Sequence, residues 1–540
     1  AAMVAATMLV AACGGGEPQP AATVPATGTP TGQAGPSGPQ DLAVGIGEDT
    51  YKTEEPEANV GFTPRAIFEP LVQMTPDYQV EPLLATDWEF VEPNTWRFHL
   101  REGVTFHDGT PFTAEAVKYT FDRIAEAGGG TLRLGEESTV VVDDHTVEVT
   151  PTVENRRLIE QLVHPSNSIV APGTSPGEES VGTGPFRFVE YVPQERLVAE
   201  RNDDYWGEPT ELETITFRFI PEANARRLAL EAGDIDLMLD VSLDAVSELE
   251  SAGFVVDRPP PGLYEAMYAN ISGEGGYTIL QDENVRKAVG HAIDRDALVD
   301  GVFDGLAVRE QTMVPARLLG EENAARIEGY SHDLDRAGQL LEESGWRPGA
   351  DGIREKDGQR LRLELVSGFP SAQEHGAVAE FLQAQLRQAG IEVAIITAPD
   401  AASYEERLNE QAGDLWLEKG NQNDANPAFL PALLFWEEGL FGNIGYQPVF
   451  APGWPPEEEQ ARVGDGTFDE VIEQALATPD PDEVKELAAE AMHLLIDEHA
   501  IVIPLAGLIR PAAHREGVAG FEAHPSNVNN TFDTVFLTGG

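Results

Sequence analysis

The sequence contains a single cysteine, Cys13, in 540 residues. One thiol excludes an intramolecular disulfide and any metal site built from several cysteines. The motifs HExxH, paired CxxC, P-loop and GxGxxG are also absent. Carboxylate pairs occur by chance in so acidic a chain, and no spacing selects one pair, so a secreted hydrolase is only a remote alternative. We therefore predict a protein that is not an enzyme.

Basic residues are scarce. The chain has 35 Lys and Arg against 93 Asp and Glu, which gives a formal net charge of −58. Such a field repels nucleic acids and anionic membrane surfaces, so we expect no nucleic-acid partner. The acidity fits either a well-solvated surface or adaptation to high salt, and both explanations stay open. Because 41% of the residues are apolar, the charge does not indicate disorder.

Long apolar runs are also lacking. Residues 1–12, AAMVAATMLVAA, are too few to span a bilayer core of about 30 Å, and they resemble the hydrophobic region of a secretory signal. Leu9–Cys13 resembles a bacterial lipobox, whose cysteine becomes lipid-modified; the alternative is an ordinary signal with an incidental cysteine. The basic segment expected at the start of a signal is missing, so we expect the sequence to begin inside it. This predicts a protein lipid-anchored through Cys13 to the outer face of the cell membrane, in the periplasm or at the cell surface.

Composition divides the rest of the chain. Residues 14–40 are rich in Gly, Pro, Ala and Thr and carry one charge, a composition that cannot bury a core and predicts a disordered tether. From Asp41 the composition is globular. Single hydrophobic cores stop growing at roughly 250–300 residues, so a chain of this length predicts at least two lobes.

The most informative stretch is WRFHLREGVTFHDGTPFTAEAVKYTFDRI, residues 96–124. Its first half alternates apolar and polar residues like a half-buried strand, and after the turn at Asp108-Gly109 we expect Thr113 to cap a helix. His99 and His107 lie on different sides of a turn, and His493 and His499 are six residues apart. Neither spacing specifies a shared metal site, so no metal ligands are predicted.

Other segments alternate between helix and strand patterns. Helices that end near a glycine and lead into a strand predict an α/β fold built on largely parallel sheets. The expected elements are a strand over 42–46, a short helix over 66–72, a hairpin over 139–150, a helix over 226–232 before a strand over 235–239, and a helix ending at Gln388 before a strand over 391–397.

Four stretches resemble one family in its own order. They are LATDW leading into residues 96–124, VGTGPFRF at 181–188, RNDDYW at 201–206 and VRKAVGHAIDRDALV at 285–299. These resemble motifs of the extracytoplasmic solute-binding proteins of peptide/nickel-type ABC importers, bacterial solute-binding protein family 5, and in particular its dipeptide- and oligopeptide-binding members. The resemblance covers roughly residues 41–540.

The resemblance implies a two-lobed, periplasmic-binding-protein-like α/β fold of type II, of the large class with an extra subdomain. Two crossover strands, within 264–271 and 500–505, would join the lobes. Lobe I would comprise 41–268 and 506–540, with the subdomain within about 75–180, and lobe II would comprise 269–505. The implied function is to capture a solute outside the cytoplasmic membrane as a monomer without a cofactor, and to deliver it to the importer's permease subunits by hinge closure.

The family's second-lobe loop, a variant of W-x-x-D-x-x-D-P-D-N, corresponds here to residues 416–427. Asp424 takes the place of the first acid of the DPDN part, whereas the upstream acid that captures a peptide amine in many relatives is replaced by an amide. Arg101 either clamps a ligand carboxylate or braces its hairpin. The expected ligand-binding residues are Phe62, Arg101, Tyr264, Trp416, Lys419, Asn421, Asn423 and Asp424.

The resemblance favours a short peptide or a peptide-like solute as the ligand. The alternative is a nickel chelate, another metal chelate or another small solute. Nickel-type members usually place an arginine after the helix near Leu162 and a histidine after the DP of the loop. This sequence has 165–167, PSN, at the first place and Asn426 at the second, which counts against a chelate. A surface-interaction module without a closing cleft is a third alternative.

Overall fold

The computed structural model describes residues 35–49, 63–128, 132–174, 180–271, 273–368, 375–435 and 468–538. Phe62, Cys13 and the predicted signal lie outside these residues. Residues 36–540 form one compact unit, to which the following description refers. None of its described helices is long and apolar enough to cross a membrane.

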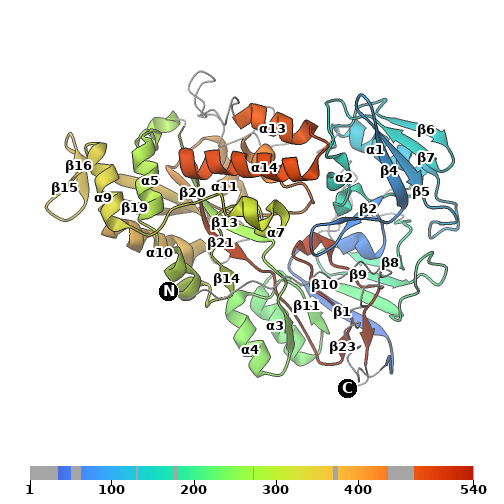
Figure 1. The fold of residues 1–540 in the computed structure, drawn as a ribbon. Helices are drawn as coiled ribbons and strands as arrows, with labels where there is room; N and C mark the ends of the chain where they lie inside the picture. Colours follow the sequence, from blue (N-terminus) through green and yellow to red (C-terminus); the bar gives the residue numbers. More distant parts are fainter. Residues whose placement is uncertain are drawn as a thin grey trace, which may run out of the picture. The chain divides into compact units, whose positions relative to one another are not determined.

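A seven-stranded sheet forms the core of lobe I (Figure 1), in the order β12-β22-β11-β1-β10-β9-β8. The central strand β1 is parallel to β10 and β11, and the outer pairs are antiparallel. The strands are β1 (Asp41–Ile46), β8 (Phe186–Val192), β9 (Arg196–Arg201), β10 (Thr214–Phe219), β11 (Leu237–Met238), β12 (Val255–Asp257) and β22 (Ala512–His514). Helices α3 (Ala223–Ala232) and α4 (Val246–Ser251) belong to this lobe.

A six-stranded sheet forms the core of lobe II, in the order β14-β21-β13-β20-β18-β19. Only β18 runs parallel to its two neighbours, so the prediction of largely parallel sheets is wrong; both sheets are mixed. The antiparallel pairs arise because both chain crossovers enter the middle of this sheet. The strands are β13 (Leu263–Ala269), β14 (Ala307–Val308), β18 (Arg362–Ser367), β19 (Glu392–Thr397), β20 (Leu415–Asn421) and β21 (Val502–Leu508).

Most of the described helices belong to lobe II. The segment at 285–299 forms two helices, because the Asp294 side chain accepts a hydrogen bond from the amide of Ala297 and starts a new helix there. The helices are α5 (Glu283–His291), α6 (Arg295–Val302), α7 (Ala316–Leu319), α8 (Glu321–Ala324), α9 (Leu334–Glu343), α10 (His375–Gln388), α11 (Ala401–Asn409), α12 (Phe429–Phe435), α13 (Phe468–Ala477) and α14 (Pro481–His493).

A separate four-stranded sheet, in the order β4-β5-β7-β6, forms the added subdomain together with α1 and α2. Its elements are β4 (Ala85–Val91), β5 (Thr95–Leu100), α1 (Ala114–Glu126), β6 (Thr139–Asp143), β7 (Thr146–Val149) and α2 (Leu158–Gln161). The predicted strand, helix and hairpin are confirmed. Val117, Phe121 and Ile124 are buried on one face of α1, although the Thr113 side chain makes no capping bond.

The predicted short helix over 66–72 is wrong. A single 3-10 turn (Thr63–Ala66) is followed by extended chain that leads into β2 (Val72–Met74), which pairs with β3 (Val80–Pro82). Glu69 instead forms a bridge with Ile169. The local apolar pattern was misleading because tertiary contacts, described below, hold this segment extended. The smaller strands are β15 (Arg347–Pro348), β16 (Arg354–Lys356), β17 (Gln359–Arg360), β23 (Val518–Ala519) and β24 (Phe536–Leu537).

The chain passes between the two large sheets twice. Residues 258–262 connect β12 to β13, and residues 509–511 connect β21 to β22. The two crossover strands lie side by side, with Leu263 opposite Leu508. A Cβ atom at Gly262 would lie 2.3 Å from the carbonyl oxygen of Pro525, so only glycine fits where the first crossover meets the C-terminal segment of lobe I. Two short adjacent connections between two sheets are the geometry of a hinge.

Candidate ligand-binding site

Glu69 connects the sequence motifs of lobe I. Its carboxylate accepts hydrogen bonds from Thr183 Oγ1 at 2.8 Å, Tyr205 Oη at 2.7 Å and Trp206 Nε1 at 2.9 Å. The side chain is only 4% exposed. Burial raises the pKa of its carboxyl, and the three donors and Arg65 act in the opposite direction. The two motifs at 181–188 and 201–206, which carry the family resemblance, thus surround one buried acid, Glu69.

The turn at 182–184 places glycines against the backbone of Ile67. A Cβ atom at Gly182 would lie 2.0 Å from the carbonyl oxygen of Ile67, and one at Gly184 would lie 2.6 Å from that of Ala66. The amide of Gly184 donates to Ile67 O at 3.0 Å. Neither glycine has a positive φ, so these residues serve close backbone approach and not a left-handed turn.

His107 joins the subdomain to the same turn. Its Nδ1 accepts from the Gly182 amide at 3.3 Å, and its Nε2 donates to the Gly184 carbonyl at 3.0 Å. Burial lowers the pKa of the ring to about 4, which keeps it neutral and suited to this pair of bonds. His99 is exposed on β5 and lies apart from these contacts. The two histidines of the 96–124 stretch therefore have different roles, and His107 holds the subdomain against the turn at 182–184.

Arg101 has protein partners on both sides. Its Nε donates to the carbonyl of Leu83 at 2.9 Å, and its guanidinium carbon lies 4.4 Å from the centre of the Trp206 ring. These contacts fix the side chain as a brace between the subdomain and the motif at 201–206. Contact between Arg101 and a ligand stays a prediction.

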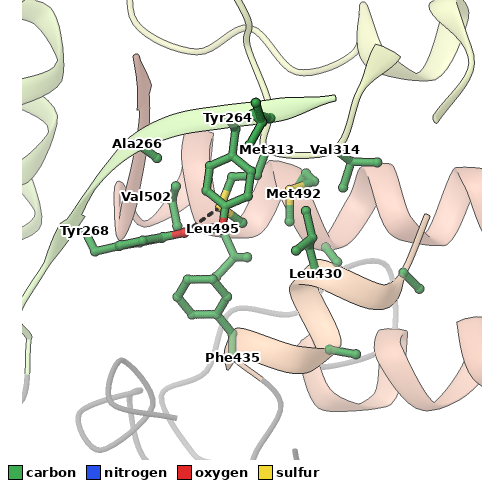
Figure 2. Close-up of a cluster of buried hydrophobic side chains, with 14 of the residues drawn as sticks. Tyr264, Ala266, Tyr268, Met313, Val314, Leu430, Phe435, Met492, Leu495 and Val502 are labelled. Atoms are coloured by element: carbon green, nitrogen blue, oxygen red, sulfur yellow. Dashed lines mark hydrogen bonds between the residues drawn. The ribbon is translucent and has the colours of Figure 1, made fainter. Parts of the chain in front are cut away.

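Tyr264, at the start of the first crossover strand, points into a cluster of buried side chains in lobe II (Figure 2). It is 5% exposed, and its hydroxyl accepts from Tyr268 Oη at 3.1 Å. Met313 and Phe435 lie in the same cluster. A Cβ atom at Gly420 would lie 2.2 Å from the Tyr264 hydroxyl oxygen, so the opposite strand leaves room for the ring by having a glycine there.

Trp416 is also enclosed within lobe II. It is 2% exposed, and its ring meets that of Tyr404 edge-on, with centroids 6.0 Å apart. The Tyr404 hydroxyl contacts the carbonyl of Leu417 at 3.1 Å and also donates to the Glu418 carboxylate. Burial raises the pKa of Glu418 to about 7, although the Tyr404 bond acts in the opposite direction. Trp416 thus helps hold α11 on β20.

The loop that follows β20 is closed by its own side chains. Gln422 Nε2 donates to Asp424 Oδ1 at 2.8 Å and to the carbonyl of Asn426 at 3.0 Å, and Asp424 Oδ1 accepts from the Asn426 amide at 3.0 Å. Asp424 is 3% exposed, and burial raises its pKa well above the ordinary value. Lys419, Asn421 and Asn423 are partly exposed. Exposed and buried side chains therefore alternate around Gln422. Asn421 and Asn423 point outward, and Gln422 points into the loop.

Asn423 brings this loop to lobe I. Its Oδ1 accepts from Ser526 Oγ at 3.3 Å, and Ser526 in turn accepts from Asn529 Nδ2 at 3.1 Å. Ser526 and Asn529 were not among the predicted site residues, because they lie in a C-terminal segment without a sequence motif. The structure thus places Lys419, Asn421 and Asn423 at alternate, partly exposed positions along the end of β20 and the loop after it, with Asn423 in contact with lobe I. Arg101 lies on the subdomain beside Trp206.

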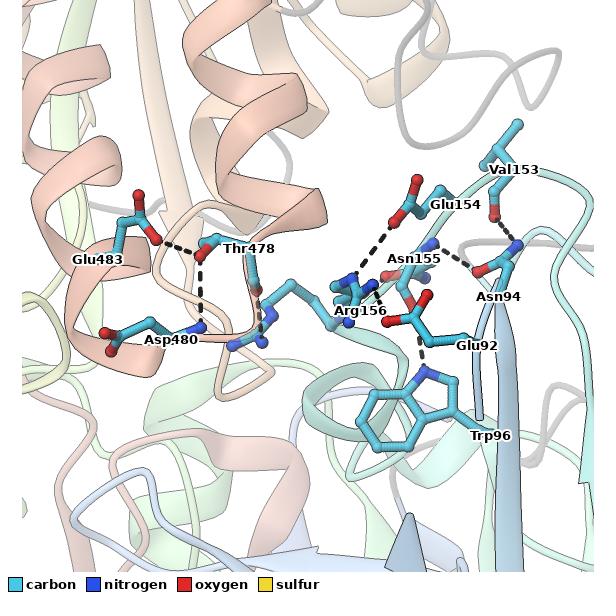
Figure 3. A network of polar contacts seen from close by, with 11 residues as sticks. Glu92, Asn94, Trp96, Val153, Glu154, Asn155, Arg156, Thr478, Asp480 and Glu483 are labelled. Carbon is cyan, nitrogen blue, oxygen red and sulfur yellow. Dashed lines mark hydrogen bonds and ion pairs between the residues drawn. The ribbon is translucent and has the colours of Figure 1, made fainter. Parts of the chain in front are cut away.

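A second set of contacts joins the subdomain to lobe II (Figure 3). Arg157 Nη2 donates to the carbonyl of Thr478 at 2.9 Å, while its Nη1 pairs with Glu160 at 3.0 Å. The amide of Arg156 donates to Leu476 O at 3.0 Å, and the amide of Ala425 donates to Glu160 O at 3.2 Å. These residues also lacked a sequence signal. Across the described ranges, no group of three His, Cys, Asp or Glu residues is arranged to hold a metal ion.

Comparisons with known proteins agree with this architecture. The sequence profile of the bacterial extracellular solute-binding proteins, family 5 (Middle), matches residues 79–439. The nickel-binding periplasmic protein of Escherichia coli K12 is 27% identical over 469 residues, 83% of this chain and 84% of that protein. The glutathione-binding protein GsiB of Salmonella paratyphi A is 26% identical over 518 residues, 92% and 94% of the two chains.

Solved structures share the fold. NikA from Brucella suis, in complex with Fe(III)-EDTA, superimposes with a TM-score of 0.76 at 26% identity, over 92% of this chain and all of that one. DppA from Helicobacter pylori, in complex with the peptide STSA, gives a TM-score of 0.72 at 22% identity, over 92% and 98% of the two chains. The two-lobed α/β fold predicted from the sequence is confirmed. Because the profile covers more than half of the chain, the protein belongs to the family 5 extracellular solute-binding proteins, the solute-binding components of bacterial ABC importers.

Proposed function

We propose that this protein captures a short peptide or a peptide-like solute between its lobes and passes it to the permease subunits of an importer. The observation that carries the proposal is the row of partly exposed side chains formed by Lys419, Asn421 and Asn423 at the end of β20 and in the loop after it. An asparagine amide offers both donors and an acceptor, which match the carbonyl and N–H groups of a peptide. A lysine beside them offers a charge for a carboxylate.

The proposal revises the set of ligand contacts. Lys419, Asn421 and Asn423 are the direct contacts, with Arg101 and Phe62 retained from the sequence. Tyr264, Trp416 and Asp424 are enclosed by protein atoms, and we assign them to supporting the loop and strand that carry the contacts. Capture follows from the paired crossovers: a solute that touches both lobes stabilises the closed form through contacts that the open form lacks.

A metal chelate is the second candidate, because the nickel-binding periplasmic protein is among the relatives. The loop Asn421–Asn426 contains amide and carboxyl side chains but no histidine. Amides and carboxylates are poor ligands for nickel in comparison with imidazole. The peptide proposal is therefore favoured.

The two candidates are separated by the solute that remains bound through purification. Denaturing the purified protein and analysing the released small molecules by mass spectrometry is expected to yield a compound with amide bonds. Adding that compound back should make the protein more compact in small-angle scattering. Release of a metal chelate alone would overturn the peptide proposal, and an unchanged scattering profile at saturation would contradict hinge closure.

We also propose that Cys13 carries a lipid that anchors the protein to the cell membrane. Cys13→Ala is expected to move the protein from the membrane fraction to the soluble extracytoplasmic fraction, because a peptide tether alone has no affinity for a bilayer. Fractionation followed by immunoblotting measures the shift. Thr7→Ala, in the same segment, serves as the control and should leave the distribution unchanged. Retention of the Cys13→Ala variant in membranes would exclude the anchor.

A further inference from the structure

Two carboxyl groups from opposite sides of the lobe contact lie close enough to repel each other. Glu160 is on α2 of the subdomain, and Asp424 is in the loop after β20 of lobe II. The subdomain is tied to lobe I, since the amide of His107 donates to Gly182 O at 2.9 Å and that of Ile169 donates to Glu69 O at 2.9 Å. The contact between Glu160 and the Asp424 loop therefore crosses from one lobe to the other, through the bond from Ala425 N to Glu160 O.

The polar partners of Glu160 are incomplete. Its Oε1 pairs with Arg157, but its Oε2 is buried without a hydrogen-bond partner in the described part of the chain. A buried carboxylate oxygen without a donor is unfavourable, whereas a protonated carboxyl has a smaller desolvation penalty. Asp424 has donors for Oδ1 only from its own loop. No basic side chain among the described groups pairs with it.

The charged groups around Glu160 and Asp424 do not cancel the rise in the two carboxyl pKa values that burial causes. Arg157 favours the ionised form of Glu160, but burial outweighs it and raises the pKa of Glu160. Burial, followed by repulsion from Glu160, raises the pKa of Asp424, with only the Asn426 amide and Gln422 acting against them. Tyr78 interacts electrostatically with both Asp424 and Arg317, and Arg317 pairs with Asp77 at 2.6 Å.

We propose that closure of the lobes takes up protons, and that Glu160 and Asp424 are the groups that bind them. In the open form water hydrates both carboxyls, whereas in the closed form they repel each other and, among the described residues, only Glu160 has a cationic partner, Arg157. The inference rests on the proposed closing function and adds its regulation: solute capture is stronger in acidic surroundings and release is easier in alkaline ones. Both residues act on the closing equilibrium, and neither needs to touch the solute.

The direction of the pH dependence follows from the linkage between proton binding and closure of the lobes. Both carboxyls have a raised pKa in the closed form, so the closed form binds more protons than the open form. Closure is fully favoured below the ordinary carboxyl pKa of the open form. It weakens as the pH rises from there through the raised values. Within that window each proton taken up changes the closing constant by about tenfold per pH unit.

Hydrogen exchange of the Arg156 amide tests the proposal, because this amide donates across the lobe contact to Leu476 O. The full chain is measured without solute at pH 5.5 and 7.5, and the rates are corrected for intrinsic exchange. In the unmodified protein the opening constant should rise about tenfold or more between the two pH values. Amides in the middle of β10 serve as a reference for opening within a lobe.

The double variant Glu160→Gln and Asp424→Asn keeps similar shapes but cannot titrate. Its Arg156 protection should be equal at the two pH values and at least as high as that of the unmodified protein at pH 5.5. Glu137→Gln removes the same charge from an exposed position of the subdomain and should behave like the unmodified protein. If the double variant does not fold, the single variant Glu160→Gln should show a reduced pH response.

Equal protection in the unmodified protein at both pH values would overturn the proton link, and so would a full pH response in the double variant. Neither result depends on the identity of the solute. Failure of the solute to compact the protein would instead overturn hinge closure itself, so the two failures can be told apart.

Discussion

Replacing Glu69 with alanine is expected to lower the free energy of unfolding by about 3–5 kcal/mol, because it leaves buried donors without an acceptor. Thr183, Tyr205 and Trp206 all donate to this carboxylate. Their loss would also release the turn at 182–184 from the extended segment that carries Glu69. Urea unfolding followed by circular dichroism measures the change.

Two further variants test whether the loss of stability comes from the three hydrogen bonds to Glu69. Glu89→Ala removes an acid of the same type from an exposed ion pair with Arg97 and should cost at most about 1 kcal/mol. Glu69→Gln keeps one acceptor but places an amide N–H against the donors, so it should be nearly as harmful as alanine. A Glu69→Ala protein as stable as Glu89→Ala would show that the three bonds contribute little.

Replacing Trp416 with alanine is expected to destabilise the protein by about 3–5 kcal/mol, since it leaves a large cavity between β20 and α11. The ring is buried against Tyr404 and lies across the strand pair from Tyr268. The same unfolding measurement gives the magnitude. Trp416→Phe refills most of the cavity and should lose clearly less stability.

The phenylalanine variant also distinguishes packing from solute contact. If Trp416 only supports β20, the folded Trp416→Phe protein should bind the co-purified solute as tightly as the unmodified protein does, in a calorimetric titration. A folded Trp416→Phe protein with greatly weakened binding would restore Trp416 as a direct contact.

Local patterns predicted the elements whose structure is decided locally. The alternation at 95–100 gave β5, the helical spacing of Val117, Phe121 and Ile124 gave α1, and Gly233, with φ of 78°, ends α3 as expected. The segment 66–72 was mispredicted because its conformation depends on partners more than 100 residues away in the sequence. Rules that use only neighbouring residues in the sequence cannot include the hydrogen bonds that Thr183, Tyr205 and Trp206 donate to Glu69.

The site was only partly accessible from the sequence. The resemblance predicted that the loop at 416–427 binds the ligand, because Trp416 and Asp424 match the family's loop. It could not tell which side chains point outward, since that depends on the internal bonds of Gln422. Glu160 and Ser526 were missed because each acts across a contact between segments far apart in the chain, and neither belongs to a motif.

The loop closed by Gln422 has a consequence for the design of sensors. Gln422 and Asp424 hold its shape with bonds to each other and to the backbone of Asn426. The outward side chains at 421 and 423 contribute nothing to those bonds, so under the proposed assignment of solute contacts, libraries of substitutions at these two positions would alter recognition while the loop keeps its shape. A fluorophore placed near the hinge would then report whichever solute the new side chains select.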